Sequence, residues 1–288
     1  MHANMKFYVV SVGGIFISLG IGMLVEFNLN YDQELSNQQA EIIKGLDSKF
    51  EILKSTNDTL EEELNKLNLS YDKAVEFINN NTDKLITGEL ESQNIGIITI
   101  NNINSNYIQD SITNASGSIM FDINITSKVL DTKILEELSN NIDREIKTTK
   151  DMVSYLLESM NDSNFEYKLK QIEELGLIKI NTLKDNLNEV DSIALMNGTL
   201  DESISKDIQD IEKTIVDALK NENKYLIGAK TVDSKSDTKI YSENGISTID
   251  NINEGSGQLA LVSLLKNKNT VGNFGTGEDA QSLIPFNN

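Results

Sequence analysis

The first apolar stretch of the chain, residues 7–25, is long enough to cross a lipid bilayer. It contains no charged residue and lies between Lys6 and Glu26. As an α-helix it covers roughly 28 Å, close to the hydrocarbon thickness of a bilayer. A cleaved signal peptide is the alternative, but its apolar region is usually shorter and ends in a small-residue cleavage site. The pattern therefore predicts one uncleaved transmembrane anchor.

The charges that flank the anchor predict its orientation. Lys6 and the terminal amine precede it, whereas Glu26 and Asp32 follow it. Because cytoplasmic flanks carry the excess of basic residues, we expect residues 1–6 to form a short cytoplasmic tail. Residues 27–288 are then expected outside the cytoplasm, in the cell envelope.

Small residues within the anchor form one ridge. Gly14, Ser18 and Gly22 are spaced four residues apart, which lets two helix backbones approach closely. Glycine is also simply common in membrane helices, and this is the alternative explanation. The ridge is a candidate self-association surface.

A heptad pattern follows within residues 28–81 and predicts a coiled coil. From Ile43 to Ile78 the apolar positions alternate three and four residues apart, which favours burial against a partner helix in a left-handed supercoil. A helix that packs on its own globular domain is the alternative. With Ile43 at position a, the candidate contact residues are Leu46, Phe50, Leu53, Asn57, Leu60, Leu64 and Leu67.

The row of a and d side chains, here called the seam, leaves the choice of partner open. Asn57 occupies an a position, where a buried amide favours a parallel, in-register pair. Lys49 and Lys54 would instead repel each other across a parallel homodimer. We therefore expect either a parallel homodimer or a coiled coil with another protein.

Residues 92–270 are predicted to form an α/β domain after an Asn-rich break at residues 79–81. Short apolar runs alternate with amphipathic stretches, which is typical of a mainly parallel sheet. Expected strands are residues 95–100, 118–125, 192–196 and 225–228; expected helices are residues 107–112, 153–160, 165–175, 200–221 and 259–265, the last entered through Gly255, Ser256 and Gly257.

Residues 271–288 read as a glycine-rich C-terminal tail. Gly272, Gly275 and Gly277 resemble a nucleotide-binding glycine motif, but no convincing strand precedes them and no helix clearly follows. A loop that needs unusual backbone angles is the better interpretation.

Composition narrows the possible chemistry. The net charge is −20, with 25 Lys and Arg against 45 Asp and Glu, which argues against nucleic acid as a partner. The chain has no Cys and a single His, His2, so Cys nucleophiles, His triads and multi-His metal sites are excluded. Adjacent acidic residues on the predicted helices point apart, so we expect them to be exposed to solvent rather than to form general acid/base pairs. We expect no enzyme, no catalytic residue and no metal ligand.

Two sets of motifs occur in a fixed order along the chain. The first set is the membrane segment, from Val10-Ser11 through Leu19-Gly20-Ile21-Gly22, followed by the heptads. The second set comprises Gly245–Ile252 with Ser247, Thr248, Asp250 and Asn251, then Gly257-Gln258, then Gly272–Gly277 with Gly275 and Gly277, and finally Pro285. Together they resemble the MctB-like copper transporter family of bacterial envelope proteins, which includes SteB-type division-associated proteins. Phe274 stands where the family usually has Tyr, and Glu26 where it usually has Gly.

The resemblance implies a single-pass anchor, a coiled coil and a Rossmann-like α/β domain. It also implies a role in copper transport or homeostasis, with copper as the possible cargo. Relatives linked to cell division act alongside a SteA-like membrane protein, so a scaffold in division or wall remodelling is the alternative. The motif residues are then structural or partner-binding. Asp250, just before a helix, is expected to cap it or hold a turn.

Overall fold

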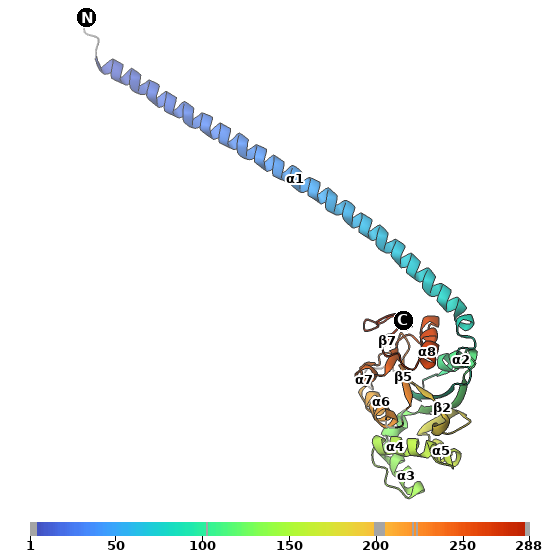
Figure 1. Ribbon diagram of the computed structural model, residues 1–288. Helices are drawn as coiled ribbons and strands as arrows, with labels where there is room; N and C mark the ends of the chain where they lie inside the picture. The colour runs from blue at the N-terminus through green and yellow to red at the C-terminus, as the bar shows by residue number, and fades with distance from the viewer. Residues whose placement is uncertain (1–4, 102, 199–204, 221, 223, 286–288) are drawn as a thin grey trace. The chain divides into compact units, whose positions relative to one another are not determined.

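The structure, a computed structural model, describes residues 5–101, 103–198, 205–220, 222 and 224–285, with the backbone alone for residues 29–34 and 205–208 (Figure 1). The chain divides into two compact units. Met1–Asp72 is helical wherever it is described, and Lys73–Asn288 holds a sheet with helices on both faces.

Helix α1, Met5–Ile86, is continuous over 82 residues. The predicted break at residues 79–81 is wrong, since the helix continues for more than a turn beyond it. An Asn costs at most about 0.7 kcal/mol in a helix relative to Ala, and burial of Thr82 and Ile86 near the end outweighs this cost. Asn81 also donates its side-chain amide to the carbonyl oxygen of Phe77 at 2.8 Å, one turn back.

Among the described residues, the second unit contains a seven-stranded sheet in the order β3-β2-β1-β4-β5-β6-β7. Neighbouring strands are parallel, except that β3 runs antiparallel to β2. The order reverses between β1 and β4, because the chain moves outward through β2 and β3 and then returns to the other side of β1. The strands are β1 (Asn94–Ile100), β2 (Ser118–Ile125), β3 (Ile178–Leu183), β4 (Ser192–Met196), β5 (Tyr225–Ala229), β6 (Ser247–Ile249) and β7 (Asn273–Phe274).

Helices cover both faces of the sheet (Figure 1). One face packs on α2, α8 and the end of α1, and the other packs on α4, α5, α6 and α7. The helices of the second unit are α2 (Asn106–Asn114), α3 (Thr132–Ile142), α4 (Thr149–Met160), α5 (Phe165–Glu174), α6 (Ser205–Lys220), α7 (Lys239–Glu243) and α8 (Gly255–Lys266), with short 3-10 turns η1 (Ser127–Leu130) and η2 (Leu187–Glu189).

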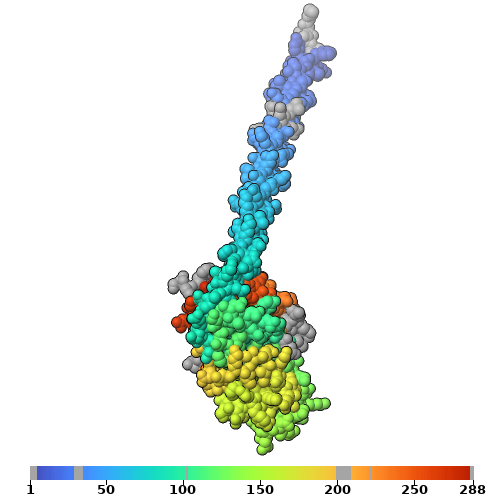
Figure 2. Space-filling view, turned by 90° about the vertical axis from the view of Figure 1, so that its right-hand side faces the viewer, coloured from blue at the N-terminus to red at the C-terminus, as the bar shows by residue number. Residues whose placement is uncertain are grey.

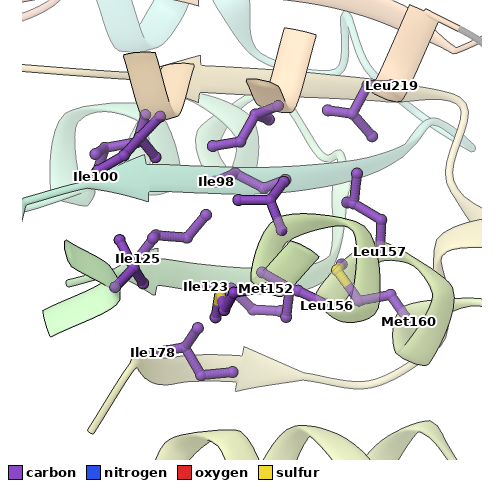
Figure 3. Close-up of a cluster of buried hydrophobic side chains, with 14 of the residues drawn as sticks. Ile98, Ile100, Ile123, Ile125, Met152, Leu156, Leu157, Met160, Ile178 and Leu219 are labelled. Atoms are coloured by element: carbon purple, nitrogen blue, oxygen red, sulfur yellow. The ribbon is translucent and has the colours of Figure 1, made fainter. Parts of the chain in front are cut away.

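Two clusters of buried side chains fill the space between the layers. Strand β1 supplies both, because its alternate residues Ile98 and Ile100 face one helix layer and Ile95 and Ile97 face the other. Figure 3 shows the first cluster, to which α4 contributes Met152, Leu156, Leu157 and Met160 beside isoleucines of β2 and β3. The fully buried β-branched residues explain why β1 was readily predicted.

The predicted fold class is confirmed at the level of an N-terminal apolar helix, a long helix and an α/β domain with a mostly parallel sheet. The strand over residues 118–125 has the predicted bounds, and so does the strand over residues 192–196. The part of the predicted helix over residues 200–221 that precedes α6 lies outside the described residues.

Part of the predicted glycine-rich tail, residues 271–288, belongs to the sheet, while Gly275 has the unusual backbone angle that was expected there. Asn273 and Phe274 form β7, which pairs with Thr248 and Ile249 of β6. Gly255, Ser256 and Gly257 are not an entry loop but the first turn of α8. Strands β6 and β7 are too short to give a periodic signal, so sequence patterns did not reveal them.

One buried carboxyl group has an unusual proton affinity. Glu212 of α6 is 1% exposed, and Asn197, which follows β4, donates its amide to it. Burial raises the Glu212 pKa to about 7, although interactions with the Tyr241 hydroxyl and with Asn197 lower it and the nearby Asp237 raises it further. The folded protein therefore holds a proton here that the unfolded chain releases near pH 4.5.

This difference predicts a pH-dependent stability. A folded-state pKa above the unfolded value gives stability that is present below pH 4.5 and is lost as the pH rises through about 7. Between pH 5 and pH 8 the free energy of unfolding of the wild type should fall by about 2–3 kcal/mol more than that of Glu212→Gln. Denaturant unfolding of the full chain measures it. The exposed Glu174→Gln is the matched control and should behave as wild type. Equal pH dependence of wild type and Glu212→Gln would contradict the assignment.

Candidate functional site

The seam of α1 is exposed along its length. Leu46, Phe50, Leu53, Leu60, Leu64 and Leu67 each expose 56–69% of their surface, and Asn57 is exposed among them. Figure 2 shows the side chains of this helix, from blue to cyan, open on the face turned to the viewer. A row of large apolar side chains in this state is a surface that a partner helix or a lipid phase can cover.

The small-residue ridge is open as well. Gly14, Ser18 and Gly22 line a shallow groove on the apolar part of α1. A Cβ atom placed on either glycine would meet no other atom within 4 Å. The Ser18 hydroxyl donates to the Gly14 carbonyl oxygen at 2.8 Å, so its polar group is satisfied within the helix. The ridge is free for close helix packing, and its use in self-association stays a prediction.

Asp250 lies where two of the predicted motifs meet. Its two carboxylate oxygens accept the backbone N–H groups of Thr276 at 2.8 Å and Gly277 at 2.9 Å. Gly275 has φ +132°, and a Cβ atom there would lie 1.9 Å from Asp250 Oδ1. Asp250 thus holds the turn after β7, and glycine is required because the carboxylate occupies the space of a side chain.

Asn251, the next residue, organises the start of α8. Its side-chain amide donates to Glu254 Oε2 and to Ser256 Oγ, both at 2.9 Å. A Cβ atom on Gly257 would lie 2.1 Å from the Asn251 carbonyl oxygen. The tight turn between β6 and α8 therefore depends on Asn251 and on the missing side chain of Gly257.

The remaining motif residues form hydrogen bonds at the edge of the sheet. Ser247 donates its hydroxyl to the Thr270 carbonyl oxygen at 2.9 Å, and Thr248 donates to Asn273 Oδ1 at 2.9 Å. Gln258 is half-buried, and its backbone N–H donates to the Glu254 carbonyl oxygen at 3.0 Å. The structure thus gathers the predicted motif residues around the junction of β6, β7 and α8.

This junction also contacts the end of α1. A Cβ atom on Gly255 would lie 2.2 Å from Thr82 Oγ1 and 2.7 Å from Asn79 Cα. Lys266, at the other end of α8, forms an ion pair with Glu89. The motif therefore has a structural role that sequence spacing alone did not reveal, since it lets α8 pack closely on the last turns of the long helix.

The described residues offer no obvious copper ligands. Among them, no group of three or more His, Cys, Asp or Glu side chains is placed to hold a metal ion. Met152, Met160 and Met196 are buried in the hydrophobic clusters, where they fill space. His2 lies outside the described residues.

Sequence reasoning missed a polar cavity beside α2. Its walls include Ser105, Gln109 and Asn124, and the fully buried Asp122 binds two of these side chains. The structure buries both faces of the end of β2, including the polar residues that alternate along this strand. Polar residues in an otherwise apolar strand were the available signal.

The arrangement defines a class of protein: an α/β domain joined to a long helix that begins with an apolar segment. Within the described residues one helical stretch, Met5–Asn28, is long and apolar enough to cross a membrane. A family model described as "Copper transport outer membrane protein, MctB" matches residues 3–285. The chain therefore belongs to the MctB family, as the sequence motifs indicated. No individually curated protein matches it significantly.

The geometry around Asp250 predicts a loss of stability on its removal. Asp250→Ala deletes the acceptor of two backbone N–H groups, which typically costs about 1–3 kcal/mol. Thermal unfolding should show a lower midpoint, and hydrogen exchange of the Thr276 and Gly277 amides should accelerate. Asp279→Ala, an exposed carboxylate on the same segment, is the control. Unchanged exchange at both amides in Asp250→Ala would refute the role of Asp250.

Proposed function

We propose that this protein is an anchored envelope protein that takes part in copper transport or homeostasis as an assembly rather than as a single chain. The match to the MctB family over residues 3–285 carries the copper part of the proposal. The exposed apolar seam of α1 supports the assembly part. The protein acts in this proposal by binding and not by catalysis.

The apolar start of α1 supports the membrane part. Met5–Asn28 has the length and composition of a spanning helix, and its side chains are exposed in the chain by itself. Lys6 precedes it and Glu26 follows it, so the basic flank favours a cytoplasmic N-terminus and an extracytoplasmic domain.

Transport of copper through the membrane would require more than one chain. One helix cannot enclose a pore in a bilayer, because a polar pathway needs protein on all sides. We infer that copies associate in parallel through the heptad seam, with Asn57 setting the register and with the ridge of Gly14, Ser18 and Gly22 allowing close approach in the membrane. Ligands for copper as cargo would then come from more than one chain.

A scaffold role in cell division or wall remodelling is the second candidate. The exposed seam favours it equally, since a heterologous helix from a SteA-like membrane protein would bury the same leucines. The repulsion of Lys49 and Lys54 in a homodimer supports this partner.

We propose a Rossmann-like domain in either case, on the strength of the strand order and of the reversal between β1 and β4.

Assembly through the seam predicts the effect of charged substitutions. Leu53→Lys with Leu60→Lys would place four ammonium groups in the interface of a dimer. The dissociation constant should rise by at least roughly 100-fold, since each buried leucine contributes more than about 1.4 kcal/mol. Analytical ultracentrifugation of the full chain in detergent measures it.

Residues outside the seam provide the matched control. Ile52→Lys with Leu69→Lys replaces two apolar side chains that are as exposed as the first pair but lie at heptad positions c and f. This control should assemble as the wild type does. If both double variants assemble equally well, the seam is not the interface.

The two candidate functions differ in the phenotype of a deletion strain. We expect growth of the strain to be hypersensitive to added copper, with septa in their normal positions by microscopy. Complementation by the wild type and failure of the seam variant would link assembly to copper handling. Normal copper tolerance with misplaced septa would instead support the scaffold.

A further inference from the structure

A cavity of about 410 Å³ lies beside the carboxyl ends of β1 and β2. Residues 103–105, between β1 and α2, form one wall with Asn106 and Gln109 of α2, and the other wall is formed by Asn124 of β2 together with Lys179 and Asn181 of β3. On the face shown in Figure 2, the α2 segment in green borders the β3 segment in yellow. The volume is within the range of small-molecule sites.

Fully buried polar groups underlie this cavity. Ser105 and Asn124 are each 2% exposed and Asp122 is 0% exposed. Asp122 accepts hydrogen bonds from Ser105 Oγ at 2.6 Å, from Gln109 Nε2 and from Asn181 Nδ2 at 3.3 Å. These bonds hold wall residues from α2 and β3 in fixed orientations, so the site is organised before a ligand binds.

The cavity adjoins the point where the strand order reverses. Ile103, which lines it, packs against the segment after β4, because a Cβ atom on Gly198 would lie 2.5 Å from the Ile103 side chain. Open α/β sheets bind ligands outside the carboxyl ends of their strands at such a reversal. The position is therefore one where this architecture leaves room for a ligand.

The lining argues against a metal ion and against a small anion. Copper prefers sulfur and imidazole nitrogen, and the lining side chains supply neither. Both oxygens of Asp122 already accept hydrogen bonds, and Lys179 adds a positive charge. A simple anion would pair with Lys179 but would face the buried carboxylate and could donate no hydrogen bond to the amide groups of the lining.

We propose that this cavity binds a saccharide unit that carries one acidic substituent. Hydroxyl and acetamido groups donate and accept, which matches the side-chain amides of Asn104 and Asn106 and the carbonyl oxygen of Gln109, whose amide nitrogen already donates to Ser105 and Asp122. The acidic substituent pairs with Lys179, which has no ion pair among the described residues. This function is independent of copper handling and gives the domain a ligand of its own in the envelope.

Saturation-transfer NMR with the full chain in nanodiscs tests the proposal. The probes are N-acetylmuramic acid, which is acidic, N-acetylglucosamine, which is neutral, and inorganic phosphate. We expect saturable binding of the acidic sugar that phosphate at the same concentration does not displace. Lys179→Ala should raise the dissociation constant of the acidic sugar about 10-fold, as expected for the loss of a charged hydrogen bond. The dissociation constant of the neutral sugar should not change.

Two further variants complete the design. Asn106→Ala should weaken the binding of both sugars, because the Asn106 amide contacts the part that the two ligands share. Lys184 lies just beyond β3 and outside the cavity, so Lys184→Ala should change the binding of neither sugar. The proposal is overturned if the wild type shows no saturable sugar binding. It is also overturned if phosphate displaces the sugar, or if Lys179→Ala and Lys184→Ala bind the acidic sugar alike.

Discussion

Apolar surface along α1 has to be withdrawn from water, and the rest of the organisation depends on how this happens. The first turns carry a continuous apolar surface that suits lipid, and the later turns carry a narrow row of leucines that suits a second helix. The two surfaces belong to one uninterrupted helix, so the proposed membrane insertion and the proposed pairing both involve α1.

Elements with a strong period or a long buried run were predictable. The isoleucines of β1 and the alternation in β2 gave bounds close to those observed, and the apolar start of α1 was evident from its length. The continuity of α1 through residues 79–81 was not predictable from helix propensity, because the helix continues there owing to the burial of its last turns. Strands β6 and β7 escaped notice since two or three residues cannot show alternation.

The motif residues were found by resemblance, whereas their physical roles came from the structure. Asp250 and Gly275 are 25 positions apart in sequence, and no periodicity connects a carboxylate to the turn that surrounds it. The cavity is a similar case. Asp122 and Asn181 come from strands separated by three helices, so only the antiparallel return of β3 brings them together.

The place of β7 has a consequence for biosynthesis. Its residues follow those of the other six described strands in the chain, yet they complete the sheet by pairing with β6. During synthesis β6 has no outer neighbour, and an unpaired strand edge invites association with other chains. The sheet is therefore complete only after β7 has been synthesised, and a chain that stopped between β6 and β7 would leave the edge of β6 open.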